Sequence, residues 1–280
     1  MEPLCLDIES EFGAFNKAFS NTGGLLTYLF PPKTAIVGML GAIVGYEFKD
    51  TLKTFSDIRV GVEILKGIET KTITYVCHYG ERPDREKKKI PVNIHQELLI
   101  NPKYRLYLDL ESLSENESLL SKVKTLLKQS DIKDSANDIN GAFRILFQNQ
   151  ISYYSPYMGK NEFPLYYQLR DRKLKSLDSS DFNKYLPTNC VIPKPKDSVL
   201  NYKIESVSEL AGFKLKRSEP FSFFILSDVP TTQNEKREFG NFKDFLLKDH
   251  SRKTVIEVEP KINNDYSFYK DGEGNLIVCF

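Results

Sequence analysis

Residues 31–45, PPKTAIVGMLGAIVG, form the longest apolar run in the chain and decide how its first half folds. The two prolines suit the entrance of a helix, and Gly45 suits its exit. Small residues recur within the run at steps of three and four, as Ala35, Gly38, Ala42 and Gly45. A strand is the competing interpretation, but the interior glycines and the length favour a helix. We expect the face of small residues to let this helix lie close against a sheet.

The composition is that of a soluble globular protein, with 40% hydrophobic and 28% charged residues among 280. The opening segment MEPLCLDIES lacks a secretory signal pattern. The longest apolar run is shorter than the roughly 20 residues that span a bilayer. We therefore expect a cytoplasmic protein without membrane contact. Basic and acidic residues number 39 and 38, for a net charge of +1, so a polyanionic partner must be argued from local clusters.

The four cysteines, Cys5, Cys77, Cys190 and Cys279, are scattered and form no C-x-x-C pair. None stands beside a histidine at the spacing of metal ligands. We expect reduced and mostly buried thiols, with no disulfide framework, no metal and no cofactor.

Alternation of apolar and polar residues predicts a strand over residues 4–12. It predicts two further strands, from residues 58 and 70, joined as a hairpin by the turn KGIE. Residues 95–110 predict strand, Asn-Pro turn and strand. The best helical pattern starts near Ser114, which forms a capping box with Glu117. Its apolar stripe is Leu119, Leu120, Val123, Leu126 and Leu127.

Residues 142–169 supply strand material interrupted by a loop, and the remainder has short apolar runs broken by prolines and charges. The order predicts an α+β fold, a ferredoxin-like or RRM-like β-α-β-β-α-β domain. We expect this domain over residues 1–168, with a protruding basic hairpin near 78–100. A smaller β-rich domain is expected over 169–280.

Three segments together carry a family resemblance. They are FGAFNKAFSNTGGLLTYLFPPKTAIVGMLGAIVG, HQELLINPKYRLYL and PYMGKNEFP, in this order. The sequence resembles the CRISPR-associated Cas5 family of the RAMP superfamily, closest to type I-B. The resemblance covers the first 170 residues well.

The resemblance implies an RRM-like domain with a β-hairpin thumb that holds the 5′ handle of the guide RNA (crRNA) in a type I Cascade complex. It also implies contacts with the backbone and large subunits, and with target DNA only through the complex. One branch of the family cuts the guide precursor, but this sequence lacks the sequence pattern that is usual for that branch around the first helix. We therefore expect a subunit without catalysis. The alternatives are a metal-independent endoribonuclease and a scaffold whose RNA contacts are incidental.

Lys33 and Thr34 stand at the entrance of the predicted helix, where free N–H groups attract phosphate. The alternative is that Thr34 caps the helix and Lys33 is solvated. The loop after the first strand, which faces the guide handle in the resembling family, adds Asn16, Lys17, Asn21 and Thr22 as candidates.

The run HYGERPDREKKK is rich in cations. On composition it is a solvated hairpin tip, but the resemblance makes it the thumb, with cations that bind phosphates. The candidates are Arg82, Arg85, Lys87, Lys88 and Lys89.

The segment SPYMGKNEF combines Gly159, Lys160 and Asn161, and three tyrosines, Tyr153, Tyr154 and Tyr157, flank it. Aromatic rings beside a basic loop can stack bases while the loop holds phosphates. The alternative is an ordinary turn with the tyrosines in the core. We favour a role in RNA binding for Lys160 and a core position for at least one tyrosine.

Cleavage of RNA without metal needs a base, an acid and a cation around one 2′-hydroxyl. His78, with Tyr79 and Lys87, could supply them. A strand-end histidine without a catalytic task is the favoured interpretation.

Overall fold

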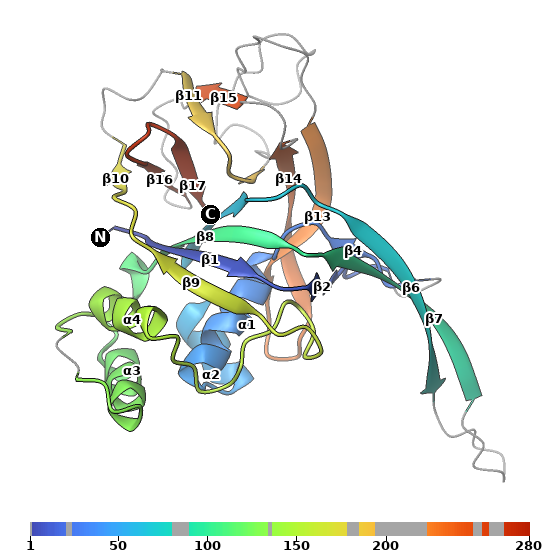
Figure 1. The fold of residues 1–280 in the computed structure, drawn as a ribbon, viewed down its shortest axis with the longest axis horizontal. Coiled ribbons are helices and arrows are strands. Elements are labelled where there is room, and N and C mark those ends of the chain that lie inside the picture. Colours follow the sequence, from blue (N-terminus) through green and yellow to red (C-terminus); the bar gives the residue numbers. More distant parts are fainter. Residues whose placement is uncertain are drawn as a thin grey trace.

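The computed structural model describes residues 2–20, 24–79, 90–133, 136–177, 185–193, 223–248, 254–257 and 266–280. Its centre is a four-stranded antiparallel sheet in the order β5-β8-β1-β9, here called the central sheet (Figure 1). The strands are β1 (Leu4–Glu9), β5 (Arg59–Ile64), β8 (Lys103–Asp109) and β9 (Tyr166–Arg170). Between β1 and β5 lie helices α1 (Lys33–Val44) and α2 (Phe48–Phe55), and between β8 and β9 lie α3 (Glu117–Gln129) and α4 (Ile139–Gln148). This is the predicted β-α-β-β-α-β order, and the α+β fold class is confirmed.

The core lies between the central sheet and the helices. Leu4, Leu6 and Ile8 alternate along β1 and are buried in one cluster with apolar residues of all four helices. The helix α1 contributes its large side chains to this cluster, among them Leu40 and Ile43. The predicted helix over residues 31–45 is therefore confirmed, and its large residues hold it on the sheet.

The small face of α1 does not lie against the sheet, so that expectation was wrong. Gly38 is exposed, and a Cβ added there would meet nothing within 4 Å. Gly41 contacts α2 so closely that an added Cβ would overlap the side chain of Thr51. The large side chains of α1 pack against the sheet in place of the small ones, because burying them removes more apolar area from water.

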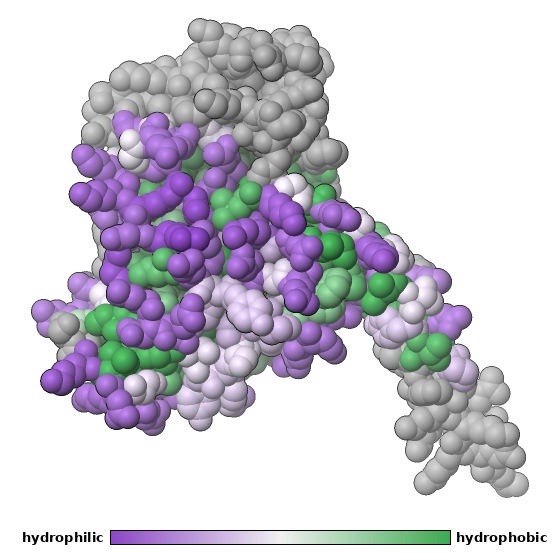
Figure 2. Space-filling model, in the orientation of Figure 1, coloured by the Kyte–Doolittle hydropathy of each residue, from purple (hydrophilic) through white to green (hydrophobic). Residues whose placement is uncertain are grey.

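The opposite face of the central sheet is polar, and Figure 2 shows mainly hydrophilic side chains over it. Asp7 is 6% exposed and accepts hydrogen bonds from Arg105 Nε at 2.6 Å and Arg170 Nε at 2.7 Å. Later strands cover part of this face: Tyr269 in β16 (Ser267–Lys270) donates its hydroxyl hydrogen to Asp109 Oδ2 at 2.9 Å.

The protruding hairpin consists of β6 (Thr70–Tyr79) and β7 (Ile90–Ile100), paired from Thr70↔Leu99 to Tyr79↔Ile90. It extends away from the body of the molecule (Figure 1). The predicted pairing of the strands from residues 58 and 70 was wrong, because β5 pairs with β8. The burial of the two strands explains the choice: β5 is almost wholly buried, whereas the first residues of β6 are exposed on both faces.

Two helices differ from the predicted pattern. Residues 142–150 were expected to be strand, but most belong to α4, where Asp138 Oδ1 accepts a hydrogen bond from Gly141 N and caps the helix. Its buried residues, Ile139, Ala142, Phe143, Leu146 and Phe147, follow helical spacing. The predicted stripe of α3 is buried except for Leu120, but its cap is the side chain of Asn116 instead of Ser114.

The later part of the chain is β-rich as expected, and its strands form two sheets in the described residues. One has the order β10-β16-β17-β11-β15, formed by Lys175–Ser176, Ser267–Lys270, Leu276–Cys279, Tyr185–Thr188 and Thr254–Glu257. The other has the order β12-β14-β13, formed by Ile192–Pro193, Phe239–Lys248 and Phe223–Gln233. The pair β13–β14, here called the ribbon, packs against α1.

The core joins the first and last parts of the chain. Phe245 of the ribbon lies 5.2 Å from the ring of Phe30 and 4.7 Å from that of Phe280. The backbones of Val60 and Phe280 exchange two hydrogen bonds of 3.1 Å. The boundary at residue 168/169 stays a prediction, and apolar packing runs across it.

Within the described ranges, no helix has both the length and the apolar character needed to cross a bilayer.

Candidate nucleic-acid interface

Two adjoining cavities along the small face of α1 form one groove, here called the α1 groove. The first, of about 440 Å³, is lined by Asn16 and Lys17, by the start of α1 and by the ribbon. The second, of about 490 Å³, lies over Gly38 and Ala42. The cavities share Thr34, Ala35, Gly159 and Gln233. Three of the four small residues that recur in the apolar run, Ala35, Gly38 and Ala42, thus line a groove.

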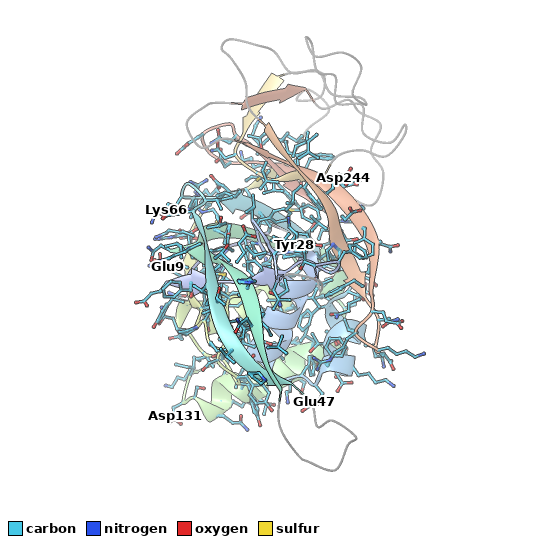
Figure 3. All side chains as sticks on the ribbon, turned by 90° about the vertical axis from the view of Figure 1, so that its right-hand side faces the viewer. Glu9, Tyr28, Glu47, Lys66, Asp131 and Asp244 are labelled. Atoms are coloured by element: carbon cyan, nitrogen blue, oxygen red, sulfur yellow. The ribbon has the colours of Figure 1, made fainter. Side chains whose placement is uncertain are left out.

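The loop that carries Lys17 is tied back to its neighbours. The short strands β3 (Phe15–Asn16) and β4 (Thr27–Tyr28) pair across it, and Lys17 N donates to the Leu26 carbonyl at 2.8 Å. Tyr28 lies between the hairpin and the ribbon in the view of Figure 3 and donates its hydroxyl hydrogen to the Asp228 carbonyl at 2.6 Å. Burial raises the pKa of Tyr28, so this hydroxyl remains a donor. These bonds fix the Lys17 loop to the ribbon.

The turn with Gly159 packs directly on the chain after β2 (Phe12–Gly13). Ala14 N donates to the Met158 carbonyl at 3.0 Å, and Phe163 N closes the turn on the Lys160 carbonyl at 3.0 Å. Gly159 has φ of 83°, and a Cβ added there would overlap the Ala14 carbonyl. Only glycine meets both demands. The turn interpretation of Gly159 is therefore correct, and the residue also lines the groove.

Lys160 is held beside the groove by neutral groups. Its Nζ donates to Gln96 Oε1 at 2.6 Å and lies 5.9 Å from the centre of the Tyr75 ring. Neither Lys160 nor Lys17 forms an ion pair with another described residue. Two cations beside a groove, without carboxylates to neutralise them, form an arrangement that attracts phosphate. Asn161, next in the turn, is exposed.

The three tyrosines before this turn are exposed, so the expectation that at least one lies in the core was wrong. Their exposed fractions are 53% for Tyr153, 51% for Tyr154 and 44% for Tyr157. The backbone explains this, because Tyr153 N and Tyr154 N bond the last carbonyls of α1 at Ile43 and Ala42, which leaves the rings outside. Tyr154 and Tyr157 line the α1 groove and offer faces on which bases can stack.

Lys33 and Thr34 lie in different places. Thr34 lines both cavities of the groove, and it does not cap α1, whose N-cap is Pro32. Lys33 instead lines a separate cavity of about 720 Å³ with Arg59 and Lys243. The structure therefore brings Thr34 to the other groove candidates and leaves Lys33 apart.

Groove residues from the ribbon were missed by the sequence analysis. Arg237 and Gln233 line the second cavity, and the Arg237 guanidinium lies 4.8 Å from the centre of the Phe48 ring. Their segment, TTQNEKREF, is typical of an ordinary hairpin turn, and it is more than 180 residues from α1. No local signal could have assigned them.

Several sequence candidates lie outside the described residues. They are Asn21, Thr22, Arg82, Arg85, Lys87, Lys88 and Lys89. For His78 and Tyr79 only the backbone is described, as the end of β6. The described residues contain no group of His, Cys, Asp or Glu arranged to hold a metal ion.

Comparison with known proteins gives one family. Residues 3–134 match the family model described as CRISPR-associated protein (Cas_Cas5). The matched region runs from β1 through α3 and includes α1 and the hairpin. A search of curated proteins gave no significant match.

Solved structures of CRISPR proteins align with the chain at low identity. A CRISPR protein from Archaeoglobus fulgidus is 12% identical, with 99% of each chain covered and a TM-score of 0.49. A chain of a CRISPR RNA-guided surveillance complex is 10% identical, with 94% of this chain and 93% of that chain covered and a TM-score of 0.47. A further Cas protein is 14% identical, with 92% and 95% covered and a TM-score of 0.38.

Proposed function

Over residues 3–134 the chain belongs to the CRISPR-associated Cas5 family, and from that premise we propose that it binds guide RNA in the α1 groove. Its role is CRISPR-associated. In the proposal it is a non-catalytic subunit of a type I Cascade complex that holds the 5′ handle of the guide. It joins the backbone and large subunits and meets target DNA only through the complex.

The observation that carries this proposal is that Lys17, Tyr154 and Tyr157 line one groove. Lys160 follows the groove residue Gly159 and bonds Gln96, which also bonds Asn16 of the groove. The lysines would bind phosphates, and the tyrosine rings would stack bases. Both contacts tolerate any sequence, so the groove would hold a single strand by its backbone. A net charge of +1 for the whole chain fits a protein whose RNA contacts are confined to one region.

The test measures binding and cleavage of labelled repeat RNA in the same samples, with EDTA present. We expect uncut RNA whose retention falls with salt. A variant with both Lys17→Ala and Lys160→Ala should lower the slope of log affinity against log salt by about 1.4, since each phosphate contact on a single strand contributes about 0.7. The matched control is Lys128→Ala, an exposed lysine of α3 that does not line the groove.

Other outcomes assign other functions. Specific cleavage that is lost in His78→Ala would contradict the proposal and make the chain a guide-processing endoribonuclease. Assembly with partner subunits that does not depend on salt or on the two lysines would instead support a scaffold.

A further inference from the structure

Gln96 is the most unusual polar residue of the hairpin. It lies in β7, whose neighbouring residues His95 and Glu97 are exposed or half-buried, yet its own exposed fraction is 1%. Buried polar side chains are costly unless every group is hydrogen-bonded. The contacts of Gln96 therefore show what its burial achieves.

The amide of Gln96 is held in one orientation. Its Nε2 faces three oxygens, at 2.9 Å from the Glu97 carbonyl, 3.2 Å from Asn16 Oδ1 and 3.4 Å from the Leu25 carbonyl. Its Oε1 accepts from Lys160 Nζ at 2.6 Å. Turning the amide over would set its NH₂ against an ammonium and its oxygen against three oxygens. The environment thus fixes the oxygen on the lysine side.

The partner of Lys160 is neutral, which matters for a cation that binds phosphate. A carboxylate in place of the amide would hold the ammonium equally well but would cancel its charge. An amide oxygen takes one of the three ammonium protons and leaves two for another acceptor. Lys160 is therefore fixed in position and keeps its full charge.

Gln96 also links three segments that are distant in sequence. It joins β7 at the base of the hairpin, the Asn16 loop and the Lys160 turn. The backbone of Leu25 also pairs with β7 at Gln96 through a parallel bridge, in which Leu25 N donates to the His95 carbonyl at 2.7 Å. Asn16 uses its oxygen toward Gln96, so its NH₂ group points away from that bond.

We propose that Gln96 is a positioning residue that presents Lys160 and Asn16 to RNA phosphates, fixing the lysine without neutralising it. The inference rests on the proposed RNA-binding function and adds to it the residue that orders the site. Gln96 itself need not touch the RNA.

The test is Gln96→Glu, which keeps the shape and supplies the carboxylate that the proposal says is excluded. We expect the melting temperature to fall, because the second carboxylate oxygen replaces the NH₂ group that faces three oxygens, while the new ion pair with Lys160 offsets part of this cost. RNA binding is therefore measured at a temperature at which the variant is folded. The slope of log RNA affinity against log salt should fall by about 0.7, the loss of one phosphate contact. Lys160→Ala should show the same loss, and the double variant no further loss. A residue with a structural role alone would leave this slope unchanged.

Two controls accompany this variant. Gln168→Glu makes the same substitution at an exposed residue of β9 and should leave the slope unchanged, because Gln168 does not line the groove. Gln96→Met keeps the length but removes the acceptor. In that variant, amine-labelling of Lys160, measured by mass spectrometry without RNA, should be faster than in the natural sequence.

The outcomes separate the two proposals. If Lys160→Ala lowers the slope and Gln96→Glu does not, the inference about Gln96 is wrong while RNA binding in the groove stands. Unchanged labelling of Lys160 in Gln96→Met would also overturn the inference, even if Gln96→Glu failed to fold. If the natural protein retains no RNA, or retains it equally at all salt concentrations, both proposals are wrong.

Discussion

Asp7 is a charged residue in surroundings from which water is largely excluded. It is buried in β1, and two arginines donate to it from β8 and β9. Burial raises the pKa of Asp7, but the hydrogen bonds from Arg105 and Arg170 outweigh burial and hold the pKa below its ordinary value. The carboxylate therefore ties together three strands of the central sheet.

We expect Asp7→Asn to lower the free energy of unfolding at pH 7 by about 3 kcal/mol, because it removes the carboxylate that pairs with the largely buried guanidinium of Arg105. A depressed pKa contributes stability above the unfolded value of about 3.9 and loses it as the pH falls through the folded value. The gap between the natural protein and the variant should thus close below that pH. Urea unfolding over a pH series measures it.

Glu9→Gln is the matched control for Asp7→Asn. Glu9 pairs with Lys103 at 2.6 Å on the same strand, but its side chain is 54% exposed. An exposed pair is worth about 0 to 1 kcal/mol, so this variant should change little. Equal losses for the two variants would show that the Asp7 contacts do not stabilise the sheet.

At the scale of elements, α1 has two glycines one turn apart with opposite surroundings. Gly41→Ala should destabilise the protein by about 1–3 kcal/mol, since the methyl group overlaps Thr51 and pushes α2 away. Gly38→Ala should stabilise it by about 0.5–1 kcal/mol, because its Cβ enters open space and alanine is the better helix former. Thermal unfolding of both variants tests the pair, and the same sign of change in both would contradict this packing of α1.

The elements that the sequence predicted well are those with a strong local pattern. The prolines and apolar period of α1 and the stripe of α3 were sufficient. The helix α4 was missed because the segment AFRILFQNQ is short and apolar enough to be a strand, and its cap at Asp138 was not recognised. The wrong partner for β5 came from the turn KGIE, whereas the choice was made by burial against β8.

The candidate site was predictable only in pieces. Lys17 and Lys160 each stood out in a polar loop, but nothing local showed that both lie beside α1. Gln96 and Arg237 gave no signal, because their roles depend on contacts with residues 64 and more than 180 positions away.

At the scale of the whole molecule, one core spans both ends of the chain. Phe245 is fully buried between Phe30 and Phe280. We expect Phe245→Ala to lower the free energy of unfolding by about 3–5 kcal/mol. Because the core is shared, far-UV circular dichroism and tyrosine fluorescence should report one coincident transition. Phe239→Ala, on the same ribbon but 39% exposed, is the control and should cost far less.

A variant that melts the ribbon alone, with α1 and the central sheet intact, would contradict a shared core. Two separate transitions in the two spectroscopic signals would be the sign.

Three buried cysteines can report the rate at which the fold opens. Cys5, Cys190 and Cys279 are free and buried in one cluster, and they come from both ends of the chain. Burial raises the pKa of Cys5 to about 12 and raises those of Cys190 and Cys279 above their ordinary value. Since alkylating reagents attack the thiolate, these thiols stay silent until the fold opens. In a Cys77→Ser background, the rate of alkylation of each buried thiol therefore measures the rate at which the fold opens around it. Equal alkylation rates for all three cysteines would show that both ends of the chain open together.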